Sequence, residues 1–278
     1  MKNRIALITG ATSGIGRITA LELAKKGFDL ILVARSEEKA LQLQSEIGDQ
    51  VKTDFIECDL SSIQSVRKAV ETIRQRYTRI DILINNAGII MQHKQMSVDG
   101  IEMTFATNHL GPFVLTIGLI TLLQVGNRSR IIHVSSAAHY FAFFKIDKLA
   151  DPGYYQDLIV YCRSKLANIL FSNELADRLE PFGITSNCVH PGTVASNFAG
   201  GGTGVTSTFM KLLRPFFKTP QHGAKTTIYV ATSPDLEGIT GKYFVNSKPA
   251  RTSGAAKNKE LGKKLWELSE ELIRTKAK

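Results

Sequence analysis

Short apolar runs alternate with helical patterns along almost the whole chain. The runs, which have the length and composition of buried strands, cover residues 4–9, 29–34, 52–57, 81–84, 130–134, 185–189 and 242–245. Between them apolar residues recur every three or four positions, which predicts helices over residues 15–26, 37–47, 62–76, 100–123, 155–179 and 221–232. This alternation is typical of an α/β fold. We expect one doubly wound parallel sheet of about seven strands with helices on both faces.

Domain organisation follows from what the chain does not contain. It shows no internal repeat and no Pro- or Ser-rich linker, so we expect a single Rossmann-type domain over residues 1–278. A long connection over residues 137–157 and a glycine-rich loop at about 198–220 are candidate substrate lids, because long loops in compact domains are often functional. Their aromatic residues are candidates for the lining of an apolar substrate pocket, and ordinary packing or a partner surface is the alternative. A helix at about 258–275 is expected to dock on the core.

Composition indicates an ordinary globular protein. The chain is 43% hydrophobic and 22% charged, and no run reaches the roughly 20 apolar residues of a membrane span. The N-terminal apolar run is shorter than a signal peptide requires, so we expect a cytoplasmic location. The three cysteines lack CxxC spacing, which favours reduced thiols over a disulfide framework or a metal site.

The net charge of +10 would attract an anionic cofactor, nucleic acid or a membrane surface. No basic cluster is interleaved with aromatic residues, and the densest basic stretch, residues 257–264, opens a predicted helix. We therefore interpret the charge as mostly solvated helix faces and expect no nucleic-acid partner.

Candidate chemistry begins with three glycines, Gly10, Gly14 and Gly16, between the first strand and the first helix. Glycines there permit a tight turn and close approach of the backbone to a pyrophosphate, while the helix N-terminus offers free N–H groups. The hydroxyls of Thr9, Thr12 and Ser13 add possible donors. A plain strand–helix turn is the alternative, but the position after the first strand favours a dinucleotide site.

The end of the second strand distinguishes the two nicotinamide cofactors. An acidic residue there would bind the ribose hydroxyl of NAD, but the position holds Ala34, and Arg35 follows. A guanidinium suits a 2′-phosphate, so we expect NADP(H), with Arg17 adding positive potential. Asp59, after the third strand, either accepts from the adenine amino group or caps the next helix.

Tyr161 and Lys165 lie four positions apart and therefore on one face of a helix. A cation about 4 Å away at an effective dielectric of about 20 is worth ~4 kcal/mol, which would lower a phenol pKa by about three units to near 7. Tyr161 would then serve as a general acid and base. On spacing alone, a packed Tyr with a solvated Lys is the commoner arrangement.

Together the motifs resemble the short-chain dehydrogenase/reductase superfamily over nearly the whole chain. They comprise residues 9–16, Asn85-Asn86-Ala87-Gly88, Asn108, Ser135-Ser136, Tyr161-Cys162-Arg163-Ser164-Lys165 and Pro191-Gly192-Thr193. The resemblance implies a catalytic set of Asn108, Ser136, Tyr161 and Lys165, with Ser135 as the fallback serine. The cofactor-binding residues that it implies are Gly10, Thr12, Ser13, Gly14, Ile15, Gly16, Arg35, Asp59, Leu60, Asn86, Ala87, Gly88, Tyr161, Lys165, Pro191, Gly192 and Thr193.

Within the superfamily the chain is most similar to retinol dehydrogenase-like members. Ser136 lies further ahead of Tyr161 than in many superfamily members, and that group carries such an insertion. The membrane anchor of many vertebrate members has no counterpart in these residues, which leaves the retinoid substrate open.

The resemblance implies an NADP(H)-dependent oxidoreductase that interconverts a small apolar aldehyde or ketone and its alcohol. Two other functions are the alternatives. A catalytically silent NADP(H)-binding regulatory protein is disfavoured because it would not need the Ser136, Tyr161, Lys165 and Asn108 set. A nucleotide-sugar epimerase or dehydratase is disfavoured because such enzymes usually carry a larger C-terminal substrate region. The sequence leaves homo-oligomer formation open.

Overall fold

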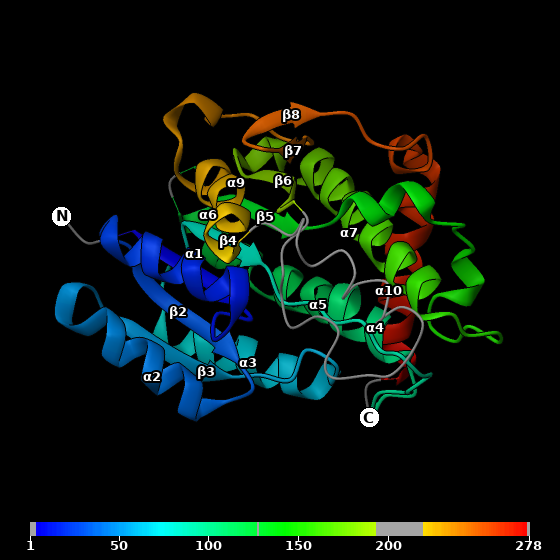
Figure 1. Cartoon of the computed structure of the whole chain (residues 1–278), viewed down its shortest axis with the longest axis horizontal. Helices are drawn as coiled ribbons and strands as arrows, with labels where there is room; N and C mark the ends of the chain where they lie inside the picture. Colours follow the sequence, from blue (N-terminus) through cyan, green and yellow to red (C-terminus); the bar gives the residue numbers. More distant parts are fainter. Residues whose placement is uncertain (1–3, 127, 193–218, 277–278) are drawn as a thin grey trace.

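The computed structural model describes residues 4–126, 128–192 and 219–276. Eight strands form one sheet in the order β3-β2-β1-β4-β5-β6-β7-β8 (Figure 1). The strands are β1 Ile5–Thr9, β2 Asp29–Ala34, β3 Thr53–Glu57, β4 Ile82–Asn85, β5 Arg130–Val134, β6 Thr185–His190, β7 Tyr243–Val245 and β8 Lys248–Ala250. The first seven pair in parallel and β8 pairs antiparallel with β7. The prediction of a doubly wound parallel sheet is therefore confirmed, with one further antiparallel edge strand.

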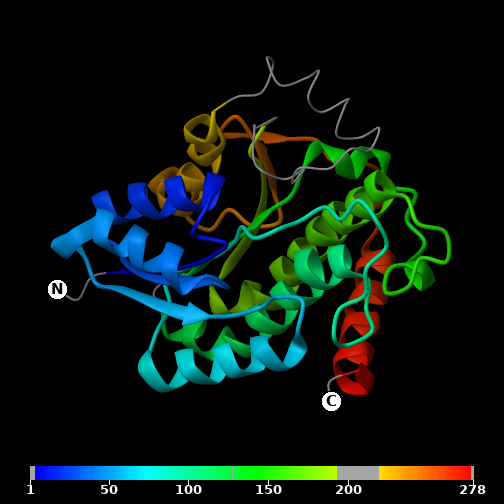
Figure 2. The ribbon, with the colours of Figure 1, turned by 60° about the horizontal axis from the view of Figure 1, so that its bottom comes forward.

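Helices cover both faces of the sheet (Figure 2). One face carries α1 Gly14–Lys25, α2 Glu37–Ile47 and α9 Pro220–Thr232. The other carries α3 Ile63–Arg76, α5 Gly111–Gly118 and α7 Asp157–Leu179, with α10 Lys259–Lys276 packed outside α7. The central strand β4 is buried along its whole length, which agrees with its apolar residues Ile82, Leu83 and Ile84, and the polar Asn85 at its end is buried as well.

The helix α3 illustrates how sequence pattern becomes packing. Its buried side chains recur at helical spacing, from Ile63 through Val66 and Val70 to Ile73. The helix begins after Ser62, whose side chain accepts a hydrogen bond from the Ser65 backbone N–H. Burying this stripe places α3 against the sheet and beside α5.

The helical stretch expected over residues 100–123 is broken into shorter pieces. Both carboxylate oxygens of Glu102 accept backbone N–H groups of the short helix α4 Met103–Phe105. A π-helical turn, Ala106–Leu110, follows and leads into α5, and α6 Ile120–Val125 comes after a break at Leu119. Helix periodicity alone could not show these changes of winding.

The remaining helical segments among the described residues are short 3₁₀ turns. They are Gly48–Gln50, Ala137–Phe141, Ile146–Lys148, Glu180–Phe182, Pro234–Leu236 and Ala255–Lys257. The predicted C-terminal helix at about 258–275 corresponds to α10. The expected substrate loop at about 198–220 lies almost entirely outside the described residues.

Candidate active site

The order of the sheet reverses between β1 and β4, and the polar motifs lie at the carboxyl ends of these and the neighbouring strands. The strand β4 pairs with β1 on one side and with β5 on the other. The glycine loop follows β1, residues 86–88 follow β4, and Ser135 and Ser136 follow β5. In open α/β sheets the crevice at such a reversal is where ligands bind.

The glycine loop and the segment after β4 are packed against each other. Gly10 has a φ of 65°, and a side chain there would begin 3.0 Å from the Ala87 Cα. A methyl group on Gly16 would overlap the carbonyl oxygen of Gly10 and the side-chain nitrogen of Asn86. The loop therefore requires glycine at these two positions for its own packing, before any cofactor is considered.

Thr9 joins the two segments through its hydroxyl. The Thr9 Oγ1 accepts hydrogen bonds of 3.0 Å from the backbone N–H groups of both Asn86 and Ala87. In return, the Asn86 Nδ2 donates to the Thr9 carbonyl at 2.9 Å. Thr9 is completely buried, so the expectation that its hydroxyl is a donor for the cofactor is wrong. Its role is to hold the loop in place.

The N-terminus of α1 is open to a ligand. Ser13 is the N-cap residue, but its exposed hydroxyl makes no capping hydrogen bond, and the first turn has no acidic residue. Thr12 is half-buried beside it, and Ile15 faces the core. Free backbone N–H groups and the positive end of the helix dipole at this point favour an anionic group.

Two arginines differ in their availability to a phosphate. Arg17 forms an ion pair with Glu46, so its charge is largely neutralised within the fold. Arg35 directly follows β2, is exposed and makes no ion pair with any residue in the described ranges. Arg35 is therefore the cation at the carboxyl end of β2 that remains available to a ligand.

Asp59 braces the loop that leads into α3. Its Oδ1 accepts from both the backbone N–H and the hydroxyl of Ser61, at 2.9 and 2.8 Å. The helix cap itself is Ser62, so Asp59 acts one step earlier than the capping alternative supposed. The side chain of the next residue, Leu60, is buried. The backbone carbonyl oxygen of Leu60 occupies the space that a side chain on Gly111 would need.

Lys165 is buried beside Tyr161 on α7. Its Nζ donates to the Val134 carbonyl at 3.0 Å and lies 5.5 Å from the centre of the Tyr161 ring. Burial lowers the pKa of Lys165 to about 8. A side chain on Gly88 would begin 3.2 Å from the Lys165 Nζ and 3.4 Å from the Asn108 Oδ1, so the absence of one leaves space where these two polar groups meet.

Asn108 comes from the π-helical turn and is held by three hydrogen bonds. Its Oδ1 accepts from the Ile89 N–H at 2.7 Å, and its Nδ2 donates to the Ile89 carbonyl and to the Ser164 Oγ. The Ser164 hydroxyl donates in turn to the Tyr161 carbonyl at 2.8 Å. The sequence interpretation missed Ser164, although its position one turn after Tyr161 signals that it lies on the same face of the helix.

The electrostatics of Tyr161 differ from the expectation. Burial raises the pKa of Tyr161 to about 12, and a hydrogen bond with Ser136 offsets only part of that rise. The prediction that Lys165 brings this pKa to near 7 is therefore wrong. The phenol is protonated at neutral pH, which suits donation of a proton more than its acceptance.

The two adjacent serines have different surroundings. The Ser135 Oγ is buried and donates to the Lys165 carbonyl at 2.8 Å, which leaves it structural. Ser136 is half-buried, and its hydroxyl is the one bonded to Tyr161. The geometry therefore agrees with Ser136 as the candidate catalytic serine.

His139 is buried and contacts the backbone of Ser136. The ring is buried, its Nδ1 lies 2.8 Å from the Ser136 carbonyl, and its Nε2 accepts from the Ser253 N–H at 3.3 Å. A neutral ring protonated on Nδ1 satisfies both contacts, and burial lowers the pKa of His139, which favours that neutral form.

The structure describes two of the three residues predicted to bind the cofactor after β6. Pro191 and Gly192 follow β6 at the same edge of the sheet, and Gly192 has a φ of 85°. Thr193 lies outside the described residues. Phe141 and Phe143 of the long connection are about three-quarters exposed, at 73% and 76%, whereas Phe144 packs on the core.

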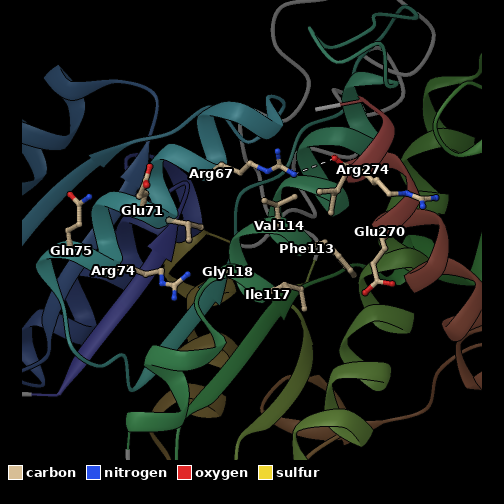
Figure 3. A pocket seen from close by; sticks show the side chains of 12 residues that line it. Arg67, Glu71, Arg74, Gln75, Phe113, Val114, Ile117, Gly118, Glu270 and Arg274 are labelled. Atoms are coloured by element: carbon tan, nitrogen blue, oxygen red, sulfur yellow. Dashed lines mark hydrogen bonds between the residues drawn. The ribbon is translucent and has the colours of Figure 1, made fainter. Parts of the chain in front are cut away.

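A groove of about 960 Å³ lies elsewhere, between α3, α5 and α10 (Figure 3). Its floor includes Phe113 and Ile117, and arginines such as Arg67 and Arg74 stand along its α3 side. None of the catalytic candidates lines it.

Within the described residues, no helix is long and apolar enough to cross a membrane, and no three side chains of metal-binding type form a cluster.

The sheet order, the glycine loop and the Ser–Tyr–Lys arrangement define a dinucleotide-binding oxidoreductase. Residues 4–202 match the family model described as short chain dehydrogenase. The chain is 40% identical to Retinol dehydrogenase 14 of Homo sapiens over 98% of its own length and 87% of that protein. It belongs to the short-chain dehydrogenase family and is an NAD(P)-dependent oxidoreductase similar to retinol dehydrogenases.

Two solved structures with this fold differ in cofactor. A blue fluorescent protein from a metagenomic library, in complex with NADPH, is 26% identical and has a TM-score of 0.70 over 87% of this chain and 95% of its own. The 3-ketoacyl-(acyl-carrier-protein) reductase from Brucella melitensis, complexed with NADH, is also 26% identical, with a TM-score of 0.67 over 87% of this chain and 96% of its own. The fold thus accommodates either cofactor.

Proposed function

We propose that this chain is an NADP(H)-dependent reductase and dehydrogenase that interconverts an apolar aldehyde or ketone and its alcohol. The observation that carries the proposal is the convergence of Ser136, Tyr161, Lys165 and Asn108 beside the glycine loop. A bound nicotinamide would supply or accept the hydride at this edge of the sheet. A cytoplasmic location is part of the proposal and is supported by three buried cysteines that form no disulfide.

In the reductive direction, the substrate oxygen would accept hydrogen bonds from the Ser136 and Tyr161 hydroxyls. As negative charge develops on that oxygen, the Tyr161 phenol would transfer its proton and Ser136 would stabilise the charge. The high pKa of Tyr161 keeps the proton available before the reaction. Lys165 and Asn108 meet at Gly88, where they can hold the ribose or a water molecule that restores the proton.

The substrate class is supported by the relatives and by the surface around the site. The similar Retinol dehydrogenase 14 is named for an apolar alcohol. Exposed Phe141 and Phe143 follow Ser136 along the chain and offer an apolar approach. The direct experiment is to follow NADPH oxidation with retinal, medium-chain aldehydes, aromatic ketones and steroids. Turnover of only polar substrates would contradict the apolar assignment.

Arg35→Ala is expected to raise the KM for NADPH by about 10- to 100-fold and to leave the KM for NADH nearly unchanged. Each charge-assisted hydrogen bond to a phosphate is worth about 1.5–3 kcal/mol, and the substitution would remove such a bond from bound NADPH. NADH has no 2′-phosphate, so its binding would lose no such bond. Steady-state kinetics with both cofactors measure the ratio. Arg17→Ala is the matched control, because Glu46 already neutralises that guanidinium. An equal change for both cofactors would mean that Arg35 does not contact the phosphate.

The value of kcat/KM for reduction is expected to fall as the pH rises above about 8. The pKa of Lys165 is lowered to about 8 in the folded chain, so the ammonium is present below that pH and is lost above it. A pH–rate profile measures this directly, since kcat/KM reports groups of the free enzyme. In Lys165→Arg, kcat/KM should no longer fall above pH 8, even if the variant is slower than wild type, because a guanidinium stays charged. A profile that stays level to pH 10 would exclude a required ammonium.

A further inference from the structure

The residue next to Asn108 is a completely buried histidine that links two distant parts of the chain. His109 lies in the same π-helical turn, and its Nε2 is 3.0 Å from the Ser269 Oγ on α10. Its ring stacks on Phe105 at 5.1 Å and meets the edge of Phe171 at 5.6 Å. A polar contact across 160 positions of sequence therefore joins the C-terminal helix to the turn that carries Asn108.

The direction of this hydrogen bond follows from its neighbours. The Ser269 hydroxyl donates its single proton to the Leu265 carbonyl at 2.8 Å, so it can only accept from His109. The ring is therefore neutral with its proton on Nε2, and burial keeps it neutral by lowering its pKa to about 3. Its Nδ1 has no hydrogen-bond partner among the described residues, so Ser269 provides the only polar anchor of the ring there.

We propose that the Ser269–His109 hydrogen bond is a positioning device that holds the π-helical turn and thereby aims the Asn108 side chain at Ile89 and Ser164. This inference rests on the proposed function, because it assigns a purpose to the orientation of Asn108. His109 and Ser269 touch neither substrate nor cofactor sites in this arrangement, so both are positioning residues.

A π-helical turn needs such support because it is less stable than regular α-helix and occurs mostly as a single turn at functional sites. It contains one residue more than an α-helical turn, and successive residues of an α-helix differ by about 100° around its axis. If the turn relaxed to α-helix, Asn108 would rotate away from the Ile89 backbone. The hydrogen bond from His109 to Ser269 is one of the interactions that oppose this relaxation, so its loss would make the relaxation more favourable.

The C-terminal helix is well placed to provide the anchor. Trp266 of α10 packs on Phe113 at 4.9 Å and on Phe171 at 5.9 Å, around the same aromatic cluster that holds His109. Figure 3 shows Phe113 of α5 and Glu270 of α10 facing each other. The Glu270 side chain accepts from the Trp266 Nε1 at 2.7 Å, which fixes the indole in place. Ser269 thus projects from a rigidly docked helix.

The test compares Ser269→Ala and His109→Phe with wild type. Ser269→Ala removes the hydroxyl that accepts from His109, together with its hydrogen bond to the Leu265 carbonyl within α10, and His109→Phe keeps a ring within the aromatic cluster. We expect each to lower kcat about tenfold, equivalent to about 1.4 kcal/mol, with the KM for NADPH unchanged. Ser172→Ala is the matched control, since it removes another buried serine contact, to Ser186 at 2.9 Å, that has no link to the π-helical turn. An unchanged kcat in folded Ser269→Ala would overturn the proposal.

Two further measurements separate positioning from general stability. In an Asn108→Ala background, Ser269→Ala should cause no additional loss of kcat, whereas a merely structural effect would add in full. Hydrogen exchange at the Ile89 amide, which donates to the Asn108 Oδ1 at 2.7 Å, should become faster in Ser269→Ala but not in Ser172→Ala. The exchange readout needs no turnover, so it tests the positioning even if the proposed reaction is wrong; unchanged exchange would refute it.

Discussion

Tyr161→Phe is expected to lower kcat for carbonyl reduction by at least about 100-fold and by as much as about 10⁴-fold. The substitution removes only the phenol hydroxyl, which bonds to Ser136 and is the proton donor of the proposed reaction. The ring remains, so its contact with the Lys165 ammonium, 5.5 Å from its centre, is retained. The affinity for NADPH should therefore change little.

Single-turnover kinetics and a fluorescence titration with NADPH measure the two quantities separately. Tyr77→Phe is the matched control: it also removes a phenol hydroxyl, bonded to Asp54, but at the end of α3. Full activity in Tyr161→Phe would eliminate the mechanism. A parallel loss of NADPH binding would instead assign Tyr161 to the cofactor site.

Gly16→Ala is expected to weaken NADPH binding by about 100-fold or more. The added methyl group would overlap the Gly10 carbonyl oxygen and the Asn86 side chain, so the loop between β1 and α1 must open. Overpacking of this kind costs about 1–3 kcal/mol in stability. It also turns the backbone N–H groups at the start of α1 away from the position where a pyrophosphate would bind.

Calorimetric titration with NADPH and thermal unfolding without it measure binding and stability. Gly262→Ala is the control, because this glycine lies within α10 and the nearest atoms to an added Cβ are 3.7 Å away. That change should be neutral or stabilise the chain by up to about 1 kcal/mol. Unaltered NADPH affinity in a folded Gly16→Ala variant would show that this loop does not bind the cofactor.

The strand–helix order was predictable because buried parallel strands and amphipathic helices leave different apolar periods in the sequence. The strand β8 was missed because all three of its residues are exposed and include Pro249. A local signal existed: Asn246 and Ser247 both have positive φ, at 49° and 60°, which makes a two-residue hairpin turn. Asparagine tolerates that region better than most residues, so the pair could have indicated the hairpin.

The candidate site divides in the same way. The residue types of the glycine loop and of the Tyr161–Lys165 pair were visible in the sequence, because the chemistry requires those types at those spacings. Burial was not visible, and burial sets the pKa of Tyr161 to about 12 and that of Lys165 to about 8. Spacing predicts which groups are neighbours, but the free energy of a charge depends on everything that excludes water around it.

The sequence by itself thus determined the strand–helix order of the sheet and the candidate residues for cofactor binding and proton transfer. The tertiary structure decided which of those residues have polar atoms that are not already used in hydrogen bonds or ion pairs within the fold. It committed Thr9 and Ser135 to internal hydrogen bonds and left Arg35 unpaired within the described residues. It also joined Ser269 to the turn that carries Asn108. Such assignments depend on contacts between residues far apart in the chain, which no local pattern of apolar and polar positions records.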